Sequence, residues 1–121
     1  MDARLREGIR LFNARRFFES HESLEEFYST TAEEHKPFLE GLILLATACR
    51  LYCDFDEVKG PVRMIRQALI RLENYQPTFM KVKVTRLMEA MEAWAKRAEA
   101  DGKQAEAEIP KIRFNRFLIF R

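Results

Sequence analysis

The chain has 121 residues, 47% of them hydrophobic and 33% charged, and a formal net charge of +2. This composition is typical of a folded globular protein and excludes a disordered chain, and so small a net charge does not favour nucleic acid as a partner. The first residues lack the apolar run of a secretory signal, and the longest apolar stretch, residues 41–49, is far shorter than the ~20 residues of a membrane helix. We therefore expect a cytoplasmic protein that does not enter the membrane.

The spacing of apolar residues is helical nearly throughout the chain. Leu5, Ile9 and Phe12 form the first apolar stripe, and this helix should end within residues 13–16. A second helix beginning at Phe17 would form a tight hairpin with it. Four residues stand at plausible packing positions for a hairpin like a tetratricopeptide unit: Phe12, Phe17, Ser20 and Leu24. One such unit is no array, so a solenoid is not expected.

Three further helices follow in the prediction. The third has Pro37 in its first turn and runs to about Tyr52, with apolar residues round most of its surface, so it should be central. The fourth begins near Pro61, and the fifth covers about residues 84–100. Signals for β-strands are almost absent outside the short sequence KVKV, which is too short to support a sheet. The predicted fold is all-α, a single-domain bundle of about five helices over residues 1–121.

The segment 110–121 differs from the rest of the chain. It holds four basic residues, no acidic ones and several large apolar side chains. Alternating arginine and phenylalanine can stack on nucleic-acid bases, but such a segment more often packs on its own bundle or on a second subunit. We expect the second arrangement, which makes a homodimer possible through this tail or through another apolar surface.

The sequence FFESHESLEEFY, residues 17–28, is the most informative part of the chain. Spacings of four and three residues place His21, Glu25 and Tyr28 on one stripe of the second helix. Aromatic residues flank this stripe on the helical wheel, so we expect a polar pair inside an apolar arc. A buried polar group without a partner costs about 1–3 kcal/mol, so the pair should be either a binding site or a structural hydrogen bond.

Several motifs in order resemble the family called domain of unknown function 309. They are Phe12-Asn13, the His21/Glu25/Tyr28 helix, Phe38-x-Glu40-Gly41-Leu42, and Gly60 followed by Arg63 or Arg66. Tyr28 stands where that family usually has tryptophan, and Glu40 stands where glutamine is common. The resemblance implies an all-helical fold of unknown activity, with suggestions of metal binding or metal-dependent hydrolysis.

Two functions remain open for this motif. In the first, His21, Glu25, Tyr28, Glu40 and Arg66 form a structural site or a site for a small ligand or a partner. In the second, His21 and Glu25 are ligands of a divalent metal in a hydrolase-like enzyme, with Glu40 as the third ligand. The HExxH motif of zinc proteases is incomplete here because its second histidine is missing, so we do not expect a zinc protease. We favour the first function and leave open whether the protein is an enzyme.

Overall fold

The computed structural model describes residues 1–115. Its α-helices, in chain order, are α1 (Ala3–Asn13), α2 (Phe17–Tyr28), α3 (Lys36–Asp54), α4 (Lys59–Leu72) and α5 (Val84–Asp101). Short 3-10 helices are η1 (Glu33–His35), η2 (Glu73–Tyr75) and η3 (Gly102–Glu108). The predicted all-α fold with five main helices is confirmed.

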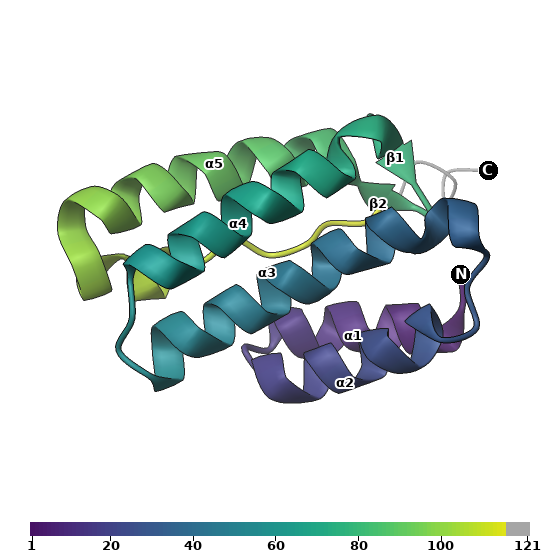
Figure 1. Ribbon diagram of the computed structural model, residues 1–121, viewed down its shortest axis with the longest axis horizontal. Coiled ribbons are helices and arrows are strands. Elements are labelled where there is room, and N and C mark those ends of the chain that lie inside the picture. The colour runs from purple at the N-terminus through teal and green to yellow at the C-terminus, as the bar shows by residue number, and fades with distance from the viewer. Residues whose placement is uncertain (116–121) are drawn as a thin grey trace.

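Helix α3 lies in the middle of the bundle, with the α1–α2 pair on one side and α4 and α5 on the other (Figure 1). Its side chains explain this position, because apolar residues on several faces of the helix are fully buried: Phe38, Leu39, Leu42, Leu45, Ala46, Ala48 and Cys49. An apolar surface that wide has to be covered from both sides. Among residues 1–115, none of the helices is both long enough and apolar enough to cross a membrane.

The hairpin of α1 and α2 closes through small residues and a ring contact. The rings of Phe12 and Phe17 meet edge to face with their centroids 5.1 Å apart. Ser20 is fully buried, and its hydroxyl donates to the Gly8 carbonyl at 2.7 Å. A Cβ atom on Gly8 would lie 2.7 Å from Cδ2 of Leu24, so the two helices approach too closely for any larger residue at this position.

Helix α4 covers the other side of α3, and α5 packs on α4 and reaches α3 through Trp94. The rings of Tyr52 and Trp94 pack edge to face at 4.8 Å, and the Trp94 indole donates to the Ala105 carbonyl at 2.8 Å. This bond docks η3 against the bundle. The chain then runs back along the bundle as far as residue 115, with Ile112 buried. The predicted tail also includes residues 116–121, which lie outside the described residues, so its packing on the bundle or on a second copy stays a prediction.

A small hairpin differs from the expectation that KVKV would form no sheet. Strands β1 (Thr78–Phe79) and β2 (Val82–Lys83) pair antiparallel across Met80 and Lys81, which both have positive φ. Two such residues form the tight turn that best matches strand twist. The segment after η3 then adds a bridge from Phe114 to Val82. The spacing of residues around KVKV could not reveal Phe114 as a partner of Val82, because Phe114 lies far from Val82 in the sequence.

Candidate functional site

The buried stripe of α2 determines where the motif residues lie. Its buried residues are Phe17, Ser20, Leu24 and Phe27. His21 and Glu25 lie beside this stripe, and their side chains are 34% and 52% exposed. The expectation of a polar pair inside a dry apolar arc was therefore wrong. Ser20 faces the core in place of His21 because its small hydroxyl can bond to the Gly8 carbonyl in the tight α1–α2 contact.

His21 and Glu25 do face each other across one turn of α2. Nε2 of His21 lies 3.5 Å from a carboxylate oxygen of Glu25, a contact that becomes an ion pair when the histidine is protonated. Both residues line a shallow hollow of about 500 Å³ together with Phe18, Glu22 and Glu26, which we call the α2 hollow. Phe18 is 46% exposed, so this hollow combines carboxylates with an accessible aromatic ring.

Tyr28 and Glu40 join α2 to α3. The Tyr28 hydroxyl donates to one oxygen of Glu40 at 2.8 Å. The other oxygen of Glu40 lies 3.4 Å from Nε of Arg71, on α4. The hydrogen bond to the Glu40 carboxylate raises the pKa of Tyr28 above its ordinary value, because loss of the proton would place two negative charges together. The three residues thus connect three helices through one carboxylate.

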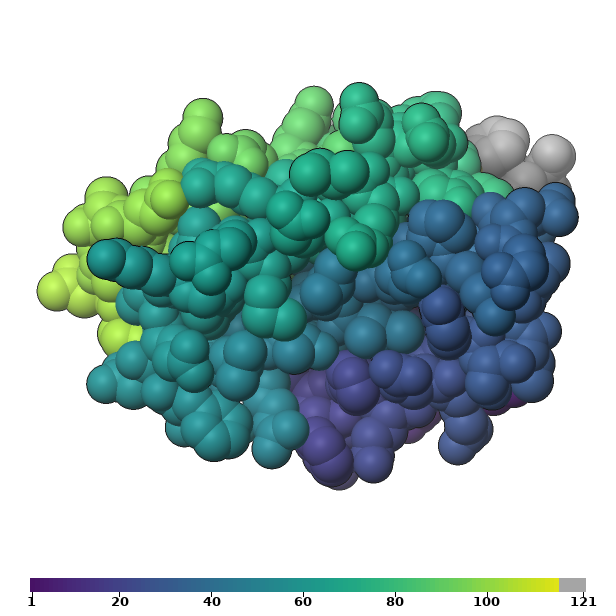
Figure 2. Space-filling model, in the orientation of Figure 1, coloured from purple at the N-terminus to yellow at the C-terminus, as the bar shows by residue number. Residues whose placement is uncertain are grey.

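These side chains line a groove between α2, α3 and α4, which we call the α2–α3–α4 groove. It has a volume of about 350 Å³, and its lining residues are Glu25, Tyr28, Glu40, Ile43, Leu44 and Arg71. In Figure 2 the surface of α3 is open to view between α2, in violet and blue, and α4, in teal. Glu25 also lines the α2 hollow, so the two depressions meet at this carboxylate.

Two of the three predicted metal ligands face each other, and the third faces other residues. His21 and Glu25 approach each other, whereas both oxygens of Glu40 face Tyr28 and Arg71. Glu40 would have to leave the Arg71 guanidinium to join the other two as a ligand. Within residues 1–115, no three His, Cys, Asp or Glu side chains are grouped closely enough to hold a metal ion together. A divalent metal at His21, Glu25 and Glu40 stays a prediction.

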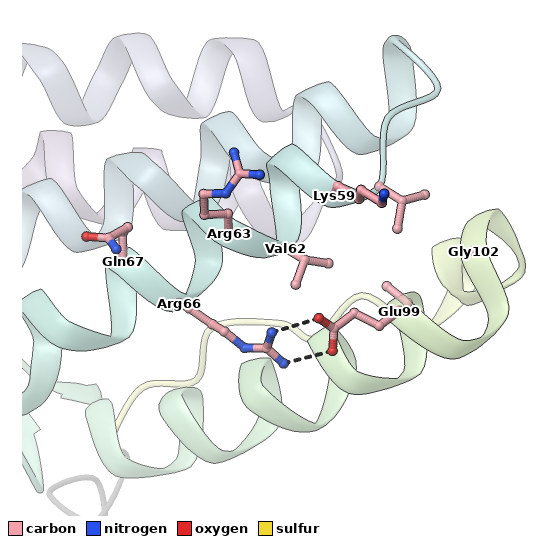
Figure 3. A pocket seen from close by; sticks show the side chains of 9 residues that line it. Lys59, Val62, Arg63, Arg66, Gln67, Glu99 and Gly102 are labelled. Atoms are coloured by element: carbon pink, nitrogen blue, oxygen red, sulfur yellow. Dashed lines mark hydrogen bonds and ion pairs between the residues drawn. The ribbon is translucent and has the colours of Figure 1, made fainter.

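Arg66 is not brought to the other predicted site residues. It points from α4 to α5, where its guanidinium binds Glu99 at 2.8 and 3.0 Å and approaches Glu92 at 3.4 Å (Figure 3). Arg71, and not the predicted Arg66, lies beside Glu40 in the groove. The connection between α3 and α4 lies about midway between residues 40 and 71, so antiparallel helices place them opposite each other. The equal distance of the two residues from this connection was the feature of the sequence that could have identified Arg71.

Other motif residues have packing roles. The side-chain amide of Asn13 donates to the Ile112 carbonyl at 2.9 Å and accepts from the Ile112 amide at 2.8 Å. A Cβ atom on Gly41 would lie 2.8 Å from Leu72 side-chain atoms and 3.2 Å from the Ala68 carbonyl, so this glycine permits the close contact of α3 with α4. These two residues make packing contacts within the fold, and neither lines the α2–α3–α4 groove.

The comparison with curated proteins found no match. A family model, described as a domain of unknown function, matches residues 5–64. The matched part begins within α1, contains α2 and α3, and ends within α4. It includes His21, Glu25, Tyr28 and Glu40, whereas Arg66 and Arg71 follow it. Through residues 5–64, the chain belongs to the family of the domain of unknown function 309.

Proposed function

We propose that the protein is a binding module and that its α2–α3–α4 groove receives a basic side chain of a partner protein. The observation that carries this proposal is the convergence of two carboxylates, Glu25 and Glu40, on a groove walled by Ile43 and Leu44. Lysine and arginine side chains carry a long apolar stem and a charged tip. A groove with an apolar wall and carboxylates matches both parts.

Glu25 is the carboxylate best placed to bind the charged tip. Glu40 already accepts from Tyr28 and pairs with Arg71, whereas the only partner of the Glu25 carboxylate in residues 1–115 is His21 at 3.5 Å. A charge-assisted hydrogen bond to Glu25 would therefore replace no stronger interaction. The α2 hollow adds Glu22 and Glu26 beside it. A partner segment with several basic residues would therefore meet several negatively charged side chains along α2.

Chemical-shift titration by NMR tests this proposal with three small probes. Butylguanidinium and butylammonium imitate the basic side chains, and butyrate has a similar stem with the opposite charge. The two cations should shift the amides of Glu25, Tyr28 and Leu44, and butyrate should not. Glu25→Gln should weaken binding several-fold, because the charge of the carboxylate is lost while its size is kept. Glu89→Gln, an exposed change on α5, is the matched control. Equal shifts with butyrate, or unchanged binding in Glu25→Gln, would refute the proposal.

A metal-dependent hydrolase with His21 and Glu25 as ligands is the second candidate. It is supported by the 3.5 Å contact of these side chains, since an imidazole and a carboxylate one turn apart can share one ion. Metal analysis of protein purified without chelators and without a histidine tag tests it. A stoichiometric metal that is lost in His21→Ala would favour this candidate over the binding module.

A further inference from the structure

A second groove lies on the opposite edge of α4, where it faces α5. This α4–α5 groove has a volume of about 690 Å³ and runs along three turns of α4, from Val58 to Gln67. Figure 3 shows Val62 pointing into the gap and the side chain of Arg66 crossing it to Glu99. The helices leave space here because the side opposite α4 carries only two small residues beside Glu99, which are Ala98 of α5 and Gly102, the first residue of η3. A Cβ atom on Gly102 would find nothing within 4 Å, so this end of the groove is open.

The charges lining the α4–α5 groove are unbalanced. Lys59, Arg63 and Arg66 stand on successive turns of α4, and Glu99 is the single carboxylate among the lining residues. Arg66 is held by Glu99 and approached by Glu92. Lys59 and Arg63 are exposed and form no hydrogen bond or ion pair within residues 1–115. Two cations on neighbouring turns are therefore free to bind an anion, and Arg63, whose guanidinium points away from Glu99 in Figure 3, would turn toward Lys59 to share it.

From this arrangement we infer that the α4–α5 groove binds a small organic anion, a phosphate or carboxylate group carried on an apolar body. The anionic group would lie between Lys59 and Arg63. The apolar body would lie over Val58, which is partly exposed, and over the apolar stems of Lys59 and Arg66, because Val62 and Ala98 are themselves buried. A groove of this volume is within the range of about 300–1,000 Å³ found for small-molecule sites.

Glu99 competes with the bound anion in this site. Its carboxylate occupies both branches of the Arg66 guanidinium, and it repels a second anion nearby. Removal of its charge should therefore strengthen binding, because Arg66 then becomes available as a third donor. Loss of the Glu99 charge and loss of the two free cations should therefore change binding in opposite directions.

The experiment uses the full chain and four probes, with amide chemical shifts as the readout. Hexyl phosphate and hexanoate carry both parts of the proposed ligand, hexanol carries only the apolar part, and inorganic phosphate carries only the charge. We expect hexyl phosphate or hexanoate to shift the amides of Val62 and Ala98 at lower concentration than either partial probe. The stronger of the two identifies the anionic group. The double change Lys59→Gln with Arg63→Gln should weaken binding about tenfold or more, since two charge-assisted contacts are lost.

Two further variants complete the test. Glu99→Gln should tighten binding several-fold, and Arg86→Gln, an exposed change on α5 outside the groove, should leave binding unchanged. Equal binding of the wild type and the Lys59→Gln, Arg63→Gln variant would overturn the inference, and so would inorganic phosphate or hexanol that binds as tightly as the complete probes. Weaker binding in Glu99→Gln would also overturn it. An amide spectrum of each variant, compared with that of the wild type, checks that the variant keeps its fold.

Discussion

Asn13 and Ile112, which are 99 residues apart, form two hydrogen bonds that tie the end of α1 to the last described segment of the chain. Asn13→Ala should lower the free energy of unfolding by about 1–3 kcal/mol, because the amide and the carbonyl of a buried residue both lose their partner. Urea denaturation measures this loss, and hydrogen exchange should be faster at the Ile112 amide. Asn74→Ala, in exposed η2, is the control. Equal stability of the Asn13 and Asn74 variants would contradict the role given to Asn13.

Gly41→Ala should destabilise the protein by about 1–3 kcal/mol, as is usual when an atom is forced into a packed contact. The added methyl group would meet Leu72, which is fully buried, and the backbone of Ala68. Gly60→Ala is the matched control, since a Cβ atom there meets only a Glu57 side-chain atom at 3.4 Å. Alanine is the better helix former, so Gly60→Ala should be neutral or stabilising. Thermal unfolding of both variants measures the difference. A melting temperature of Gly41→Ala no lower than that of Gly60→Ala would contradict the close contact assigned to Gly41.

His21→Ala should change the free energy of unfolding by less than about 1 kcal/mol, the range of exposed ion pairs. The sequence alone suggested a larger loss, because a buried Glu25 would be left unpaired. In the structure both side chains remain in contact with solvent, so water can replace the histidine. Urea denaturation of His21→Ala, Glu25→Ala and the double variant checks this expectation. A loss well above 1 kcal/mol that the double variant recovers would indicate a buried pair after all.

The pH dependence of the Tyr28–Glu40 contact has a definite sign. The pKa of Tyr28 is raised in the folded protein by its hydrogen bond to Glu40. The contact therefore contributes its full stability below the unfolded tyrosine pKa of about 10, and this contribution is lost as the pH rises through the folded pKa. The difference in stability between wild type and Tyr28→Phe should shrink accordingly in alkaline solution.

A titration of the tyrosine ring by NMR measures the same effect directly. Tyr28 should ionise at a higher pH than an ordinary tyrosine, and Glu40→Gln should bring its pKa back toward the ordinary value. Comparison with Tyr28→Phe identifies the resonance, because Tyr52 and Tyr75 are also present. A Tyr28 pKa at or below the ordinary tyrosine value would show that the hydrogen bond to Glu40 does not form in solution.

Periodicity predicted the helices well because each one buries a continuous apolar face. Helix α3 is the best case, since its residues are apolar on nearly every side and it lies in the centre. The prediction for α2 failed by one position. Its aromatic residues lie on both sides of His21, so the helical wheel did not distinguish a core stripe through Ser20 from one through His21. The distinction depends on the Gly8 carbonyl of α1, which a single-helix pattern does not include.

The candidate site was predicted in part for the same reason. His21, Glu25 and Tyr28 lie on one helix, so their spacing alone places them together. Arg71 joins them only through the antiparallel packing of α3 and α4, and Arg66 is drawn to α5 by two carboxylates. Contacts between helices depend on which faces are turned together, which is a property of the whole bundle.

The bond between Asn13 and Ile112 has a consequence for synthesis on the ribosome. The α1–α2 hairpin can form soon after its residues leave the exit tunnel, but Asn13 must wait until Ile112, 99 residues later, has also been translated before its partner exists. During that interval the apolar faces of α3 and α4 also lack Trp94 and the rest of α5. The nascent chain therefore presents apolar surface to chaperones and proteases from the completion of α4 until α5 and Ile112 have left the ribosome.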